Sequence, residues 1–151
     1  MTTVSLKDLN KELSKISKEL NSKMKELPNG VIRELTIGAN LIRNTIILSM
    51  RNTPKTGREY RRGSKSHIAS SPGKPPAIDR GELVRSIMYD IREMEVEIGN
   101  EAGAPYGSYL EEGTKNIEPR PWLEPAVNKH KNNILKNITG VCIDIVKKPL
   151  E

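Results

Sequence analysis

The segment of residues 106–127 constrains the fold of this chain more than any other, because it forces the backbone to change direction between two helices. A short helical turn ends at Gly113, which accepts a positive φ that other residues rarely adopt. Pro119 and Pro121 then fix φ and keep the chain extended. Apolar residues return at helical spacing from Leu123 onwards. The sequence therefore predicts a helical turn, a rigid Arg-Pro-Trp corner and a long C-terminal helix over residues 122–148.

The residues along this segment form an ordered motif: a tyrosine-rich turn, a Leu-Glu-x-Gly-Thr step, an Arg-Pro-aromatic corner and a Pro-Ala helix start. Its members are Tyr106, Tyr109, Leu110, Glu111, Gly113, Thr114, Arg120, Pro121, Trp122, Pro125 and Ala126. This motif resembles the tail-component family of long-tailed bacteriophages and prophages, the neck or tail-completion proteins at the head–tail joint. Two positions depart from the family pattern, because Glu112 stands where an aromatic residue is usual and Trp122 replaces a phenylalanine.

A second block upstream extends the resemblance to the region 51–127. It is similar to the family's central loop and comprises residues 53–60, residues 67–77, Gly81, Glu82, Leu83, Ser86 and Ile87. The family usually has Asp-Thr-Gly where this chain has Asp79, Arg80 and Gly81. The two blocks occur in the family's order and at family-like spacing, so together they are a specific signal.

The resemblance implies an α+β domain in which long helices pack on a small antiparallel sheet and a long basic loop projects. It also implies a structural role in the virion, as a homo-oligomeric ring, sixfold or twelvefold, at the head–tail junction. The implied partners are head-closure or connector proteins, tail terminator or tail-tube proteins, and the packaged DNA that leaves the head through the ring. The motif residues from Tyr106 to Trp122 would form subunit contacts.

The excess positive charge of the chain is confined to residues 51–80. This segment holds eight basic residues against two acidic ones, a net charge of +6, and the whole chain also has a net charge of +6. Its candidate contact residues are Arg58, Arg61, Arg62, Lys65 and Lys74. A cationic arm suits phosphates, although Tyr60 is its one aromatic residue and offers no platform for stacked bases. Three interpretations stay open: contact with DNA, contact with an acidic neighbouring subunit, or a solvated loop.

Apolar spacing predicts the remaining elements. The spacing predicts an amphipathic helix within residues 1–28, with Ser5 as its N-cap and an end at Pro28; its narrow apolar stripe could dock on the domain or pair with another helix. A second helix over residues 31–51 is apolar more nearly all round and should be the centre of the core. Alternation predicts strands over residues 87–91 and 96–98. Two strands are marginal alone, so helix packing or further strands from residues 51–80 are required.

The composition predicts a thin core. A chain of 151 residues should form one domain, residues 1–151. Only 35% of the residues are apolar, with no phenylalanine and one tryptophan, so Ile, Leu and Val must build most of the core. Neighbouring subunits could supply part of the stability, or the chain could be a monomer with long solvated helices.

No arrangement of side chains in the sequence predicts a catalytic or metal site. Glu111 and Glu112 are neighbours on a helical turn and point in different directions, and we expect Glu111 to form a salt bridge with Arg120. His67 and His130 lack the spacing of metal ligands. We therefore expect no enzymatic activity, no cofactor and no metal. The alternatives to the virion role are a free-standing basic nucleic-acid-binding protein and a small nuclease or toxin.

The expected compartment follows from three further features. Cys142 is the single cysteine, which suits a reducing cytosol. The N-terminus lacks the basic and apolar regions of an export signal. The longest aliphatic run, residues 46–48, is far short of the ~20 residues that a membrane span needs. We expect assembly in the host cytoplasm, a final location in the virion and no membrane association.

Overall fold

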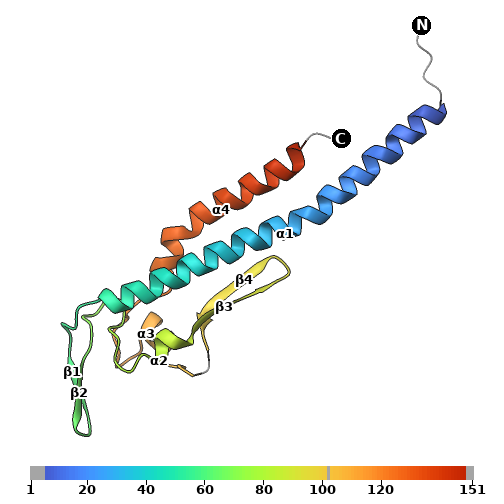
Figure 1. Ribbon diagram of the computed structural model, residues 1–151. Helices are drawn as coiled ribbons and strands as arrows, with labels where there is room; N and C mark the ends of the chain where they lie inside the picture. The colour runs from blue at the N-terminus through green and yellow to red at the C-terminus, as the bar shows by residue number, and fades with distance from the viewer. Residues whose placement is uncertain (1–5, 102, 149–151) are drawn as a thin grey trace.

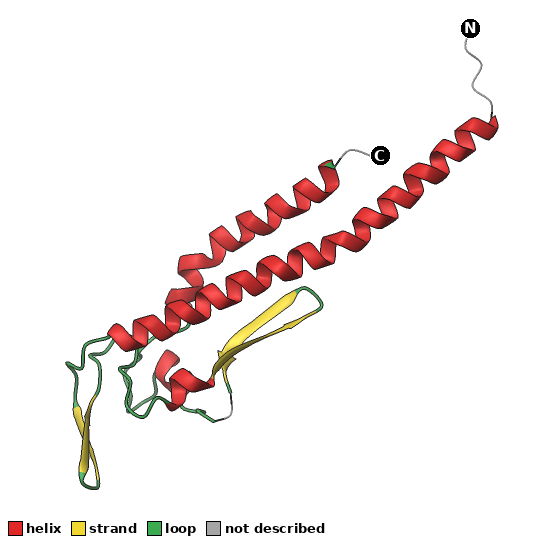
Figure 2. Ribbon diagram, viewed as in Figure 1, coloured by secondary structure: helices red, strands yellow, loops and turns green. Residues whose placement is uncertain are grey.

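The computed structural model describes the backbone of residues 6–101 and 103–148, and their side chains except those of residues 6–10 and 62. The elements are α1 (Leu6–Asn52), β1 (Glu59–Arg62), β2 (Lys65–Ile68), α2 (Glu82–Ser86), β3 (Ile87–Arg92), β4 (Glu95–Asn100), α3 (Gly107–Glu112) and α4 (Glu124–Lys147). The fold is α+β, as predicted (Figure 2). The two long helices lie side by side, and the strands form two separate antiparallel hairpins (Figure 1).

α1 runs without interruption past Pro28, so the prediction of a helix end there is wrong. A proline inside a helix removes one backbone hydrogen bond and costs about 3 kcal/mol. Packing of α4 along this part of α1, in the opposite direction, offsets that cost (Figure 1). A Cβ at Gly30 would lie 2.7 Å from Val141 Cγ1, so this glycine allows close approach of the two helices.

Polar contacts from the end of α4 hold the same stretch of α1. Lys148 Nζ donates to Glu26 Oε1 at 2.7 Å. Lys23 Nζ donates to the carbonyl oxygens of Val146, at 3.3 Å, and of Lys148. Carbonyls at a helix C-terminus have no partner within the helix, and a cation suits that end of the dipole. Contacts on both sides of Pro28 therefore keep α1 helical where its own sequence favours a break.

The N-terminal part of α1 extends beyond the end of α4 (Figure 1). Within its apolar stripe, Leu13, Leu20 and Met24 are not covered by the described part of the chain, since they are 57%, 51% and 68% exposed. Ser5, the predicted N-cap of this helix, lies outside the described residues.

The hydrophobic core lies between the C-terminal half of α1, the junction of α2 with β3, and the start of α4. Its buried residues are Ile42, Ile46, Met50, Leu83, Ile87, Ala104, Trp122 and Ala126. Three of them belong to α1, which confirms that residues 31–51 are the centre of the core. The core is small for a chain of this length, as the composition predicts.

α1 also covers one face of the hairpin formed by β3 and β4, which confirms both predicted strands and extends each of them. Asn40 Nδ2 donates to the Tyr89 hydroxyl at 2.8 Å, and Arg43 Nε donates to the Ile87 carbonyl at 2.8 Å. Helix packing therefore supports this hairpin, as expected for a sheet of two strands.

The turn of the β3–β4 hairpin has an unusual geometry for its sequence. Arg92 pairs with Glu95, which leaves Glu93 and Met94 as a two-residue turn. Both turn residues have a positive φ, 50° and 72°. Hairpin turns of this kind favour Asn-Gly, because larger side chains are strained at positive φ.

The basic segment projects from the body as predicted, and its central part is the β1–β2 hairpin (Figure 1). Glu59 pairs with Ile68, and Arg62 pairs with Lys65. These strands form their own sheet and do not extend the β3–β4 hairpin. No element of the described chain covers this hairpin as α1 covers the other, so it lacks the support that two strands normally need.

Candidate functional site

The Arg-Pro-Trp corner is a buried junction between α3 and α4. Trp122 is 3% exposed, and its Nε1 donates to the Gly107 carbonyl at 3.0 Å. Arg120 is 7% exposed; its Nε donates to the Ser70 carbonyl at 3.1 Å and its backbone N–H to the Leu110 carbonyl at 2.6 Å. A charged side chain is stable at such depth only with hydrogen-bond partners. The corner therefore ties the loop after β2 to α3 and to the core.

Glu111 caps α4 and does not form the predicted salt bridge with Arg120. Its Oε2 accepts hydrogen bonds from the backbone N–H of Trp122 at 2.6 Å and of Leu123 at 2.9 Å, and its Oε1 accepts one from Glu124 at 2.8 Å. The first N–H groups of a helix have no partner within the helix, and a carboxylate also suits the positive end of its dipole. The predicted pairing is wrong because these donors occupy the carboxylate.

The turn between α3 and the corner depends on Gly113 and Thr114. Gly113 has a φ of 78°, and a Cβ there would lie 2.9 Å from the carbonyl oxygen of Ile117. Thr114 Oγ1 accepts hydrogen bonds from the backbone N–H of Asn116 at 3.2 Å and of Ile117 at 3.1 Å. The motif residues with such roles inside the chain are Glu111, Gly113, Thr114, Arg120 and Trp122.

A cavity of about 370 Å³ lies between the base of the β1–β2 hairpin, α2 and α3. Three of the four tyrosines of the chain line it, namely Tyr60, Tyr106 and Tyr109. Arg58 also lines it and lies over the Tyr60 ring at 5.5 Å, within the range of a cation–π contact. Tyrosine and arginine are enriched among the residues that dominate protein–protein binding. The buried Ser70 Oγ in its wall has no hydrogen-bond partner among the described residues.

The remaining motif residues complete the wall or the corner. Leu110 lines the cavity and is partly buried. Pro121 is also partly buried, between the two buried residues of the corner. Tyr109 is 57% exposed, and Tyr106 is 37% exposed. The cavity is therefore an open site whose aromatic side chains are partly exposed to solvent.

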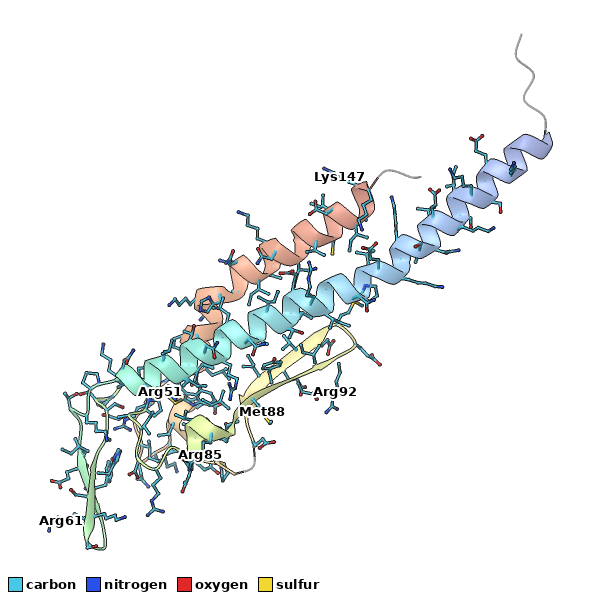
Figure 3. All side chains as sticks on the ribbon, in the orientation of Figure 1. Arg51, Arg61, Arg85, Met88, Arg92 and Lys147 are labelled. Carbon is cyan, nitrogen blue, oxygen red and sulfur yellow. The ribbon has the colours of Figure 1, made fainter. Side chains whose placement is uncertain are left out.

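Four of the five predicted cationic contact residues lie together. Arg61, Arg62 and Lys65 belong to the β1–β2 hairpin, and Arg58 immediately precedes it. Arg61, labelled in Figure 3, is exposed, as are Arg58 and Lys65. Lys74 lies apart, in the loop between β2 and α2. The structure thus gathers four of the five cations on or beside one projecting hairpin, and Arg58 at its base lines the cavity.

The acidic character of the β3–β4 hairpin was missed by the sequence analysis. Its residues 87–100 carry Asp90, Glu93, Glu95 and Glu97 against the single cation Arg92, a net charge of −3. Asp90 and Glu97 occupy directly opposite positions on the two strands, which is unfavourable for like charges. The acids are visible in the sequence, but the strand register is needed to show that two of them face each other.

Each histidine has a polar side chain of this chain as its partner. His130 Nε2 lies 2.8 Å from Thr45 Oγ1, and His67 Nδ1 lies 3.5 Å from Asp79 Oδ1. Within residues 6–101 and 103–148, no three His, Cys, Asp or Glu side chains are grouped so that they could hold a metal ion. No helix in the described part of the chain has the length and apolar character of a membrane span.

Comparison of the chain with protein-family models, with curated proteins and with solved structures gives no match in any of the three. The resemblance to the tail-component family therefore rests on the residues of the two sequence blocks alone.

Proposed function

We propose that this chain is a structural virion protein of the phage head–tail junction, which assembles as a ring that links the head-side connector to the tail and surrounds the DNA channel. The observation that carries the proposal is the set of exposed apolar side chains on α1 and α4, the two long helices of Figure 1. The large exposed side chains there are Leu13, Ile16, Leu20, Met24, Ile32, Ile37, Leu41, Leu48, Leu135, Ile143 and Val146. Extended apolar surface of this kind is typical of a subunit that neighbours cover.

The chemistry of the candidate site supports binding without turnover. Tyrosines and arginines line the cavity, and these side chains recognise protein surfaces through contact area and hydrogen bonds. The carboxylate of Glu111, which contacts the corner, already accepts three backbone hydrogen bonds and so acts in folding. The proposed mechanism is a repeated contact between unlike surfaces around an axis, which closes a ring. It requires no catalytic group, cofactor or metal.

Two measurements test the proposal. The purified full-length chain should form closed rings with a central channel, visible by negative-stain electron microscopy and as a discrete mass by light scattering. Deletion of its gene from the phage or prophage genome that carries it should give separate heads and tails. A chain that stays monomeric at every concentration, or a deletion that still yields joined particles, would rule out this role.

The exposed cations of the β1–β2 hairpin favour one second candidate, a free-standing nucleic-acid-binding protein. This candidate predicts that the monomer binds duplex DNA and that its affinity falls with salt, by about 0.9 log units per log unit of salt for each phosphate contacted. Tight binding by a monomer, together with normal particles from the deletion, would favour it over the ring.

A further inference from the structure

We propose that the turn of the β3–β4 hairpin in one copy of this chain inserts into the tyrosine-lined cavity of the next copy. The inserted segment is Glu93, Met94 and Glu95, and the receiving surface is the cavity bounded by the β1–β2 hairpin, α2 and α3. The inference rests on the proposed function, because it assigns the contact that joins neighbouring subunits of the ring.

The residues of the turn are poorly suited to folding alone. Glu93 and Met94 both have a positive φ, a conformation that costs a residue with a side chain roughly 1–2 kcal/mol. Asn-Gly would remove most of this strain. Met94 nevertheless presents a large apolar side chain at the tip, 48% exposed. Strained positions that persist are concentrated at functional sites, so the choice of residues points to a role outside the hairpin's own fold.

The two hairpins of the chain carry opposite charges of equal size. Residues 58–68 hold four cations and one glutamate, a net charge of +3, whereas residues 87–100 have a net charge of −3. Arg92 Nε forms an ion pair with Asp90 Oδ2 at 2.6 Å, and the described part of the chain supplies no partner for the carboxylates of Glu93, Glu95 and Glu97. Complementary charges of this kind steer two surfaces together and fix their register.

The cavity fits the tip in size and in chemistry. A volume of about 370 Å³ accepts one long side chain with part of its turn. Methionine sulfur makes favourable contacts with aromatic rings, and three tyrosines form the wall. The exposed Arg58 and Arg80 belong to the same wall, where they would meet the carboxylates of Glu93 and Glu95.

The tip cannot fill the cavity of its own chain. β3 begins next to α2, which lines the cavity, and runs away from it for six residues, or about 20 Å at the usual rise of a strand. In Figure 3, Arg92 near the turn and Arg61 on the other hairpin lie far apart. A second copy must therefore supply the tip. The donor and receiving surfaces differ, so the contact is head-to-tail and can repeat into a ring.

DNA fits the cavity less well than a second copy does. Phosphates would meet the cations of the β1–β2 hairpin, but a DNA backbone offers no apolar group to the tyrosine-lined wall. It also leaves the acidic hairpin without a partner. The proposed contact accounts for both hairpins and for the strained turn together.

The first test separates folding from association. Glu93→Asn combined with Met94→Gly relieves the backbone strain and removes the inserted side chain, so the variant should melt at a higher temperature than the parent. Its self-association, measured by analytical ultracentrifugation on the full chain, should nevertheless weaken at least about tenfold, which corresponds to ~1.4 kcal/mol. A variant that is more stable and associates as tightly as the parent would overturn the inference.

The second test exchanges charges between the turn and the cavity. An acid-reversed variant carries Glu93→Lys and Glu95→Lys, and a base-reversed variant carries Arg58→Glu and Arg80→Glu, since both arginines line the cavity. Each alone should associate at least about tenfold more weakly than the parent, because like charges then meet across the contact. An equimolar mixture of the two should regain most of the parent's association, since each variant offers the surface that the other needs.

A matched control reverses two exposed cations of α4, with Lys129→Glu and Lys136→Glu, and should leave association unchanged. Loss of association that mixing does not restore would overturn the inference. The same holds if the base-reversed variant loses binding to a short DNA duplex yet self-associates normally, since DNA would then be the partner of this wall. If every variant forms rings as well as the parent, the hairpin–cavity contact is wrong but the proposed ring function stands. If the parent chain never associates, both the contact and the ring function are wrong.

Discussion

Removal of the Glu111 carboxylate should destabilise the fold by about 2–3 kcal/mol. Its two oxygens accept three backbone hydrogen bonds at the start of α4, and the N–H groups of Trp122 and Leu123 are partly buried donors. A hydrogen bond to a charged group contributes roughly 1.5–3 kcal/mol. The loss of an ordinary helix cap costs only about 0.5–2 kcal/mol, because water replaces it. Glu111 also links α3 to α4, so the expected loss lies above that of an ordinary cap.

Urea unfolding of Glu111→Ala, monitored by far-ultraviolet circular dichroism, measures this loss in the free energy of unfolding. In a thermal melt, a change of 1 kcal/mol shifts the melting temperature of a domain of this size by about 2–4 °C, so we expect the melting temperature to fall by roughly 4–12 °C. Glu111→Gln keeps one acceptor oxygen and should lose about half as much. Glu112→Ala is the matched control, because its side chain is exposed and should change stability by less than about 0.5 kcal/mol. If Glu111→Ala is no less stable than this control, the carboxylate does not hold the corner together.

Three further predictions concern the core, the helix pair and the projecting hairpin. Trp122→Ala should cost about 3–5 kcal/mol and give insoluble or assembly-defective protein, because it empties a buried site and leaves the Gly107 carbonyl unpartnered; a soluble variant with the parent's assembly would contradict this. A Cβ at Gly38 would lie 2.7 Å from Ile134 Cδ1, so Gly38→Val should cost about 1–3 kcal/mol. A Cβ at Gly140 would have no atom within 4 Å, so Gly140→Ala should increase the free energy of unfolding by about 0.5–1 kcal/mol. If the two variants have the same melting temperature, α1 and α4 do not approach each other closely at Gly38. The last prediction replaces four cations on or beside the β1–β2 hairpin by neutral residues, namely Arg58, Arg61, Arg62 and Lys65. The circular dichroism spectrum and the melting temperature should stay unchanged, but head–tail joining should be impaired. Normal infectious particles from this variant would exclude a role for the charge of these residues.

Elements that depend on local rules were predictable from the sequence. Alternating residues identified the β3–β4 hairpin, and Gly113 with the two prolines identified the corner that precedes α4. Helix spacing identified residues 31–51 as the centre of the core. These signals lie within a few residues of one another, so no knowledge of distant contacts is needed to interpret them. The concentration of cations in residues 51–80 was equally plain, although the position of four of them on or beside a hairpin next to a cavity was not.

The tertiary structure alone decided three features. Pro28 lies inside α1 because α4 packs beside it, and contacts from residues more than a hundred positions away outweigh a local cost of about 3 kcal/mol. Glu111 caps α4 because the corner places the helix N-terminus against it, whereas the sequence suggested Arg120 as its partner. The cavity exists only where the loop after β2, α2 and α3 meet. Local spacing determines which segments form helices and strands, but the partner of each side chain depends on segments that are distant in sequence and adjacent only after folding.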